Sequence, residues 1–356
     1  MVGANRPRGE QEDCHDGSVR VVAAPDKLRG SAPASAVAKA IGDAAFELGW
    51  DCDEVPMADG GEGTLEALGG PNRTTAVTGP LGVPVDAPWR LDGRTAVIEM
   101  AAASGLALVG GADTNDPVAA STVGTGELVV AAPDVGARRV IVGLGGSATT
   151  DGGLGALRAM HPIGRLKGIE LVVACDSRLP FLDAAEVFAP QKGATPAQVE
   201  LLRRRLERLA QVYLEDHGVD VLALEGAGAA GGLAGGLAAA GGTLVSGFDL
   251  VADELELDAR IEGADLVITA EGFLDEQSFE GKVVGGVADL ADALDVPVVA
   301  IAGQVYDGAG ARVEAISLVD RFGEARAWAD TVACIREVTT DILRQHGSRA
   351  DRRGDP

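Results

Sequence analysis

Residues 138–153 read RRVIVGLGGSATTDGG, a short apolar run followed directly by a loop rich in glycine, serine and threonine. A run of this length, rich in valine and isoleucine, is typical of a strand buried on both faces of a parallel sheet. The glycines allow the backbone to approach another group closely, and a helical pattern begins near Gly153. The stretch therefore predicts a strand–loop–helix unit of an α/β fold.

The same pattern recurs along the chain. Further apolar runs of strand length, each ending in Asp, Glu or Gly, are RVVAAPD (20–26), DEVPMAD (53–59), IELVVACD (169–176), ADLVITAEG (264–272) and VPVVAIAG (296–303). Helical stretches lie between several of them, for example PASAVAKAIGDAAFEL at 33–48. This alternation predicts a Rossmann-like, doubly wound parallel sheet, in which ligands bind outside the carboxyl ends of the strands.

Residues 72–101 follow a different pattern, with Gly-Pro, Gly-Val-Pro and Asp-Gly turn signals between short strands. They predict antiparallel hairpins and hence a second domain. We therefore expect two α/β domains, one Rossmann-like and one smaller with a mixed sheet, with the active site in the cleft between them. The expected boundaries are 19–66 and 115–345 for the Rossmann-like domain, 67–114 for the hairpin-rich part of the second, and disordered tails at 1–18 and 346–356.

The chain is strongly acidic: its 356 residues include 30 Lys and Arg against 54 Asp and Glu, a net charge of −24. Such a surface repels nucleic acid and anionic lipid, so neither is an expected partner. A small acidic substrate would be held only where a few cations and backbone N–H groups are focused. The first 18 residues lack the apolar core of a signal peptide and no run of about 18 apolar residues exists, so we expect a cytoplasmic protein. We also expect a monomer or homodimer.

The loop after residue 144 has the composition of a phosphate cradle. Glycines let backbone N–H groups face an anion, a helix starting near Gly153 adds its positive dipole end, and the hydroxyls add donors. It is not a Walker A loop, because no Gly-Lys-Ser/Thr follows, and a simple glycine-rich turn is the alternative. The candidate phosphate-binding residues are Gly145, Gly146, Ser147, Thr149, Asp151, Gly152 and Gly153, and, in a second such loop, Asp59, Gly60 and Gly61.

Charged side chains follow several predicted strands. Asp26, Lys27 and Arg29 follow the first one, and Asp176 ends the run IELVVACD. Asp275 and Lys282 come after the run ADLVITAEG. Carboxylates at strand ends are typical Mg²⁺ ligands or general bases in phosphoryl transfer, although each alone is as well explained by a helix N-cap or a loop ion pair.

One motif points elsewhere. GAGAAG at 226–231 matches the dinucleotide-binding pattern G-x-G-x-x-G, after a possible strand DVLALEG and before a helical stretch. It would suit an NAD-dependent dehydrogenase. The acidic residue that should close a second strand is missing, however, because Asp249 lies in a turn-like stretch.

Taken together, these segments resemble the glycerate kinase family of the bacterial glycerate 2-kinase type. The resemblance spans about residues 20–305. It is carried by AAPDKLRGS (23–31), VPMADGGEGT (55–64), IEMAAASGL (98–106), STVGTGEL (121–128), GLGGSATTDGGLGAL (143–157), ACD (174–176), FAPQKGAT (188–195), GAGAAGGL (226–233), DLVITAEGFLDEQSFEGK (265–282) and VAIAG (299–303).

The resemblance implies an ATP- and Mg²⁺-dependent kinase that phosphorylates D-glycerate, giving 2-phosphoglycerate. Under it, we expect Asp176 to act as the base and Lys27 and Arg29 to hold the glycerate carboxylate or the transferring phosphoryl group. Lys282 would offset charge nearby and Asp26 would complete the catalytic set. Mg²⁺ would be held by Asp275, Asp151 or Asp176.

The chain departs from the family pattern within two motifs and in the length of two segments. Arg29 stands where the family usually has lysine and Phe273 where it usually has arginine, and the segments 157–169 and 177–186 are shorter than usual. A kinase of a related hydroxy or sugar acid, or a nucleotide-binding protein without transferase activity, therefore remain alternatives.

Overall fold

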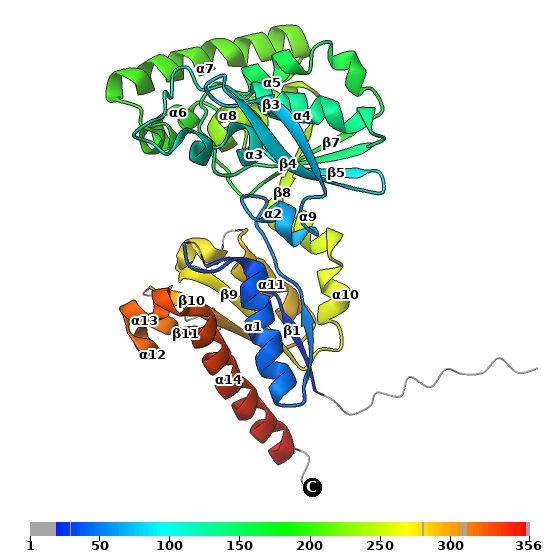
Figure 1. The fold of residues 1–356 in the computed structure, drawn as a ribbon, viewed down its shortest axis with the longest axis vertical. Coiled ribbons are helices and arrows are strands. Elements are labelled where there is room, and N and C mark those ends of the chain that lie inside the picture. The colour runs from blue at the N-terminus through cyan, green and yellow to red at the C-terminus, as the bar shows by residue number, and fades with distance from the viewer. Residues whose placement is uncertain (1–18, 29, 280, 307, 309–311, 354–356) are drawn as a thin grey trace, which may run out of the picture.

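The computed structural model describes residues 19–28, 30–279, 281–306, 308 and 312–353, which form two lobes joined by a narrow junction (Figure 1). The first lobe is built on a five-stranded sheet in which every pair of neighbouring strands is parallel. Its strand order is β11-β10-β9-β1-β2, with bounds β11 (Glu314–Ser317), β10 (Val298–Val305), β9 (Leu266–Leu274), β1 (Arg20–Ala23) and β2 (Asp51–Glu54).

Helices cover both faces of this sheet, as the doubly wound pattern predicts. Val21 and Ala23 of β1 pack toward the helices α1 (Ala34–Glu47), α12 (Leu318–Phe322), α13 (Glu324–Ala329) and α14 (Thr331–Arg353). Val22, between them in sequence, packs toward α9 (Gly247–Glu254), α10 (Leu257–Ile261) and α11 (Val283–Ala293). Successive side chains of a strand point to opposite faces, so an apolar run without alternation is buried on both.

The second lobe contains a six-stranded mixed sheet. The antiparallel strands predicted at 72–101 are confirmed, and three parallel strands continue the sheet beyond them. In sheet order the strands are β3 (Arg73–Thr78), β4 (Pro84–Asp92), β5 (Thr95–Glu99), β6 (Arg139–Gly143), β7 (Glu170–Cys175) and β8 (Thr243–Ser246). Its helices are α3 (Ala101–Ser104), α4 (Val123–Asp134), α5 (Leu154–Ala159), α6 (Asp183–Phe188), α7 (Pro196–His217) and α8 (Ala229–Ala239), with short 3₁₀ turns η1 (Leu106–Val109), η2 (Ile163–Leu166) and η3 (Pro190–Lys192).

This strand pairing differs from the expected grouping, which joined all of 115–345 to the first segment. β6 and β7 pair with the hairpin strand β5, so they belong to the second lobe. The chain returns to the first lobe only at α9. Buried parallel strands have the same apolar pattern in either sheet, so the pattern predicts the strands but not which sheet they join.

Two short helices form the junction. α2 (Thr64–Ala67) and α9 lie between the sheets (Figure 1). Leu65 and Leu250 pack into a small core with Ile141 and Val172 of the second sheet, whereas Val251 of α9 packs into the first lobe. The two lobes are therefore joined by short helices that pack one apolar face against the first lobe and another against the second.

Two further predictions from the sequence concern the stretch 220–226 and the C-terminal tail. The stretch 220–226, a possible strand, forms turns instead, and α14 continues to Arg353 through most of the tail expected at 346–356. The expected tail at 1–18, Arg29 and residues 354–356 lie outside the described residues. In the part of the chain that is described, no helix has both the length and the apolar character needed to cross a membrane.

Candidate active site

Five carboxylates come together where strands of both lobes end. Asp26 follows β1, Asp59 follows β2, and Asp176 follows β7 of the other lobe. Glu271 is near the end of β9 and Asp275 directly follows that strand. Glu271 is buried and Asp26 and Asp176 are half-buried, and each of the three is influenced by the charge of another carboxylate of the group. The structure therefore brings Asp26, Asp59, Asp176 and Asp275 of the predicted site residues together with Glu271, whereas the predicted Asp151 is not part of this group.

Asp176 and Asp59 link the two lobes. Burial, reinforced by the negative charge of Asp59, raises the pKa of Asp176 to about 6, while Lys282 acts in the opposite direction. A side-chain hydrogen bond with Asp59 also favours the protonated form of Asp176. Two ionised carboxylates in such contact repel each other, so the pair readily binds a proton or a cation between them.

Asp26 and Lys27 form an ion pair at the end of β1, with Lys27 Nζ 3.5 Å from Asp26 Oδ1. The Lys27 backbone N–H also donates to Asp26 Oδ1 at 2.7 Å. Burial raises the pKa of Asp26 to about 6, because the neighbouring Lys27 offsets the loss of hydration only in part and Asp59 adds to the rise.

Glu271 is the functional candidate that the sequence reasoning did not single out. It is 7% exposed, and its Oε1 has no hydrogen-bond partner among the described residues. Burial raises its pKa to about 7 against the opposing effects of Ser278 and Lys282. Asp275 Oδ1 accepts from the Ser278 backbone N–H at 3.1 Å, which fixes the turn beyond β9. The signal was present, since Glu271 ends an apolar run as Asp176 does.

The loop 145–153 connects β6 to α5, which begins at Leu154 as predicted. The loop is clamped by Leu106 N–H donating to Gly146 O and Ala148 N–H donating to Ser104 O. Within the described part of the chain, acceptors are absent for the backbone N–H groups of Gly145, Gly146, Ser147, Thr149 and Thr150. The buried hydroxyls of Thr149 and Thr150 have no partner there either. Gly145 is half-buried and Gly146 exposed, so their N–H groups can face a ligand, and consecutive N–H groups of this kind fit an anion.

Asp151 has a different role from its neighbours in this loop. Its Oδ1 accepts from the Gly153 backbone N–H at 3.1 Å, and its Oδ2 accepts from Thr122 N–H at 2.9 Å and Gly155 N–H at 3.1 Å. The Thr122 hydroxyl donates to the same carboxylate. Its oxygens are thus occupied in joining the starts of α4 and α5, which leaves little capacity for a metal ion.

The two glycine-rich loops that the sequence singled out touch each other. A Cβ on Gly145 would lie 2.9 Å from Gly61 Cα, and one on Gly60 would lie 2.6 Å from Gly247 Cα at the start of α9. Gly60 O accepts from the Leu144 N–H at 2.8 Å. The glycines are needed here because backbones from both lobes cross in contact.

The G-x-G-x-x-G segment packs against the same loop. Ala230, Gly231 and Gly232 all have left-handed backbone conformations, with φ of 52°, 73° and 87°. A Cβ on Gly231 would lie 2.0 Å from Thr149 O. No strand precedes the segment, so it is not the strand–turn–helix of a dinucleotide site, and its glycines instead allow close packing against residues 149–153.

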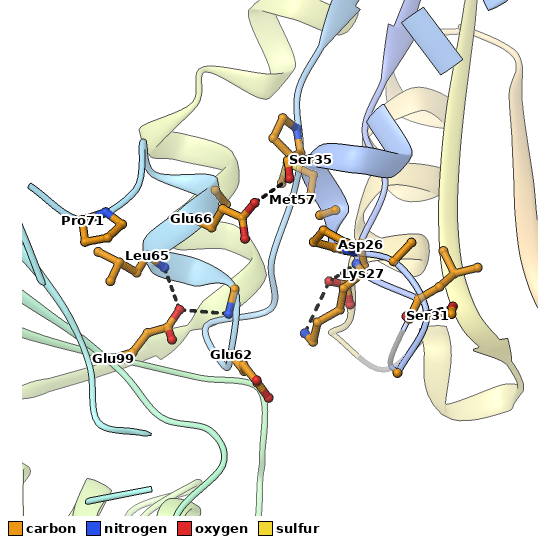
Figure 2. A pocket seen from close by; sticks show the side chains of 18 residues that line it. Asp26, Lys27, Ser31, Ser35, Met57, Glu62, Leu65, Glu66, Pro71 and Glu99 are labelled. Carbon is orange, nitrogen blue, oxygen red and sulfur yellow. Dashed lines mark hydrogen bonds and ion pairs between the residues drawn. The ribbon is translucent and has the colours of Figure 1, made fainter. Parts of the chain in front are cut away.

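A cleft of about 600 Å³ opens between the lobes beside Asp26 and Lys27. Figure 2 shows these two side chains facing Glu62 across it. Glu99 of β5 accepts at Oε1 from the backbone N–H groups of Gly63 (2.9 Å) and Leu65 (2.8 Å), which anchors α2 on the other wall. Ser35 of α1 donates to Glu66 of α2 at 2.5 Å, so the cleft is bridged at one side.

The outcome for the predicted site residues is therefore mixed. Asp26, Lys27, Asp59, Asp176, Asp275 and Lys282 gather at the inter-lobe strand ends, whereas Asp151 is engaged inside the second lobe. Arg29 lies outside the described residues. Across the ranges that are described, no group of three or more His, Cys, Asp or Glu side chains has the arrangement of a complete metal site.

Comparison with known proteins gives one consistent result. The sequence profile described as the glycerate kinase family matches residues 21–163 and 160–346. Glycerate 2-kinase of Escherichia coli K12 is 42% identical over 332 residues, covering 82% of this chain and 87% of that protein. Glycerate kinase of Bacillus subtilis 168 is 40% identical, covering 81% and 85%.

A solved structure agrees with these sequence matches. The crystal structure of a candidate glycerate kinase 2 from Salmonella typhimurium LT2 superposes with a TM-score of 0.79 at 35% identity, over 94% of this chain and all of that one. Because the sequence match covers nearly the whole chain and extends to the motifs that line the inter-lobe site, this chain belongs to the glycerate kinase family.

Proposed function

We propose that this protein is an ATP-dependent kinase that transfers a phosphoryl group to the 2-hydroxyl of D-glycerate. The observation that carries the proposal is the meeting of Asp176 and Asp59 from opposite lobes, beside a loop whose N–H groups have no acceptor in the part of the chain that the structure describes. The named relatives support the choice of glycerate, since those that cover most of this chain include a glycerate 2-kinase.

The loop 145–150 is the proposed binding place for the ATP phosphates. It offers the backbone N–H groups of Gly145, Gly146 and Ser147, which have no acceptor among the described residues. Preorganised donors of this kind bind phosphate oxygens without the cost of rearranging during the reaction. In a chain of net charge −24, such a local concentration of donors is what allows a polyanion to bind.

Glu271 and Asp275 fit a magnesium ion. The unpartnered Glu271 Oε1 supports this, because a buried carboxylate oxygen without a donor is suited to a cation. Mg²⁺ is commonly bound by one or two carboxylates, with phosphate oxygens and water completing its coordination, so a three-residue protein site is not required. When bound there, the ion would neutralise charge on the transferring phosphoryl group.

Lys27 and Asp176 are the proposed contacts of the acceptor. Lys27 in the cleft would hold the glycerate carboxylate, and Asp176 would accept the proton of the attacking hydroxyl at its carboxylate oxygen. A base whose pKa is raised to about 6 is largely ionised at neutral pH yet a better proton acceptor than an exposed Asp. Lys282, which favours the ionised form of Asp176, keeps the base ready.

The decisive experiment is an ATP-consumption assay with a panel of hydroxy acids, followed by assignment of the product by NMR. We expect D-glycerate to have the highest kcat/KM and the product to carry phosphate at position 2. The cleft of about 600 Å³ has room for larger acids, so a higher kcat/KM for one of them would favour the related-acid alternative.

The variant Asp176→Asn tests the mechanism. It removes the proton acceptor while keeping size and hydrogen bonding, so we expect kcat to fall by roughly 10²–10⁴-fold with ATP binding and thermal stability retained. A matched control is Asp86→Asn, exposed on the hairpin strand β4 and outside the carboxylate group. Near-normal turnover in Asp176→Asn would remove Asp176 from the role of base.

A further inference from the structure

Lys192 is a buried cation that the proposed chemistry does not yet use. It ends the 3₁₀ turn η3, and only 3% of it is exposed. Its Nζ donates to Ser147 Oγ at 2.7 Å and to the Thr149 backbone carbonyl at 2.7 Å. Both acceptors belong to the loop 145–153, so the ammonium group lies directly behind the proposed phosphate cradle.

A second contact ties the same two segments together. Asn115 Nδ2 donates to the backbone carbonyl of Lys192 at 2.9 Å and to that of Ala148 at 3.0 Å. The consecutive loop residues 147, 148 and 149 are therefore each held from behind. Among the described residues, the N–H groups of Gly146 and Ser147 have no acceptor, and Gly146 is exposed, so this part of the loop can still face a ligand.

The charge of Lys192 has little compensation inside the protein. The ring of Phe188 lies 5.9 Å from Nζ, and Asp151 is the charged residue whose field acts on it among those described. The Asp151 carboxylate is already occupied by backbone N–H groups and the Thr122 hydroxyl. An incompletely paired ammonium in the interior is costly unless a second anion approaches, so its burial behind unpartnered donors points to a bound anion.

We propose that Lys192 is a positioning residue that braces residues 147–149 from behind and supplies the counter-charge for the nucleotide phosphates bound on the loop. This inference rests on the proposed function, because it assumes that the anion is a nucleotide phosphate. It assigns Lys192 no direct contact with the reacting atoms. Its effect is exerted through Ser147 Oγ, the Thr149 carbonyl and the local electrostatic potential.

The proposal has a measurable consequence for proton binding. Burial lowers the pKa of Lys192 to about 7, with Asp151 acting in the opposite direction. An anion on the loop favours the charged form of the lysine and raises its pKa again. The free protein at pH 7.5 then has a partly neutral Lys192, and nucleotide binding draws a proton onto it.

The test is calorimetric titration of the full-length protein with a non-hydrolysable ATP analogue and Mg²⁺ at pH 7.5, in two buffers of different ionisation enthalpy. The difference in heat gives the number of protons taken up. We expect uptake of roughly half a proton for the natural protein. For Lys192→Met we expect an uptake smaller by that amount and a Kd at least tenfold higher.

Controls separate charge, geometry and folding. Lys167→Met, on the exposed turn after η2, should leave both Kd and proton uptake unchanged. Lys192→Arg keeps the charge, but its larger planar group does not fit a side chain that is only 3% exposed without moving its neighbours, so we expect only partial recovery of affinity. Ser147→Ala removes one acceptor and retains the lysine. It should weaken nucleotide binding with proton uptake preserved, and it serves if Lys192→Met does not fold.

The outcomes distinguish the two claims. If the natural protein binds no nucleotide, the proposed function fails and this inference fails with it. If it binds and Lys192→Met shows the same proton uptake and affinity, only the role of Lys192 is overturned. Equal losses of affinity for nucleotide and for glycerate in Lys192→Met would likewise assign the lysine to general folding.

Discussion

At the scale of single residues, Glu271 is a candidate functional residue whose buried carboxyl group lowers the stability of the native state at neutral pH. The Glu271 carboxyl group is 7% exposed, and its Oε1 has no hydrogen-bond partner among the described residues. Its burial is therefore imposed by the packing of the surrounding residues and is not stabilised by its own hydrogen bonds. Its pKa rises from the ordinary value of 4.5 to about 7, mainly because burial disfavours the charged form. Such a group destabilises the native state at neutral pH unless a cation binds, which is the expected property of a metal ligand.

The direction of the pH dependence follows from linkage. Between about pH 4.5 and 7 the native state retains the Glu271 proton that the unfolded chain has lost. Stability from this group therefore rises as the pH falls from 8 toward 5. We expect Glu271→Gln to raise the free energy of unfolding at pH 8 by about 1–3 kcal/mol and to flatten its pH dependence. Urea denaturation without Mg²⁺ at pH 5, 6.5 and 8 measures this.

The same substitution should reduce turnover at least tenfold, since a neutral amide is a poor ligand for Mg²⁺. Asp53→Asn is a useful comparison, because Asp53 pairs with Arg260 of α10 at 2.8 Å rather than with the carboxylates of the candidate site. A variant Glu271→Gln that is less stable at pH 8 than the natural protein would contradict the burial argument.

At the scale of elements, the shape of the phosphate loop depends on backbones that touch. The segment 230–232 follows a left-handed path beneath Thr149, whose carbonyl also accepts from Lys192. Any side chain at Gly231 would displace this carbonyl and, through it, the N–H groups of the loop. The glycines of GAGAAG are thus required by packing, which is why the motif resembles a dinucleotide site without being one.

A matched pair of substitutions isolates that contact. Gly231 and Gly168 have similar φ, 73° and 82°, so alanine costs about 1–2 kcal/mol at either for the left-handed backbone alone. A Cβ at Gly231 would lie 2.0 Å from Thr149 O, whereas none of the described atoms lies within 4 Å of a Cβ at Gly168. We expect Gly231→Ala to lose about 1–3 kcal/mol more and to raise the KM for ATP, as chemical denaturation and steady-state kinetics would show. Equal losses in the two variants would mean that the loop adjusts freely.

At the scale of the whole molecule, the two lobes have separate cores connected by a small one. Val142 and Leu237 belong to the core of the second lobe, and Val21 and Ile268 to that of the first. Leu250 is the residue of α9 that packs into the connecting core, and it is 7% exposed. The site lies across this connection, so its geometry depends on how firmly the lobes are joined.

Leu250→Ala tests the coupling. It should cost about 2–5 kcal/mol, as for other buried leucines, and it should split thermal unfolding into two calorimetric transitions. Leu257→Ala, fully buried within the first lobe, should cost a similar amount but leave one transition. A single sharp transition in Leu250→Ala would show that other contacts join the lobes. With both substrates bound across the cleft, the two transitions should merge again.

Local sequence patterns predicted most of the parallel strands, the helices that start at Ala34 and Leu154, and the carboxylates that follow the strands, but not β8 or β11. These follow from local periodicity and from glycine and proline, which act within a few residues. Two features became visible only in the folded chain: β6 and β7 join the hairpin sheet, and Glu271 and Lys192 are buried without full compensation of their charge. Sheet membership and desolvation depend on contacts between residues far apart in the chain, and a sequence pattern does not record which buried surfaces meet.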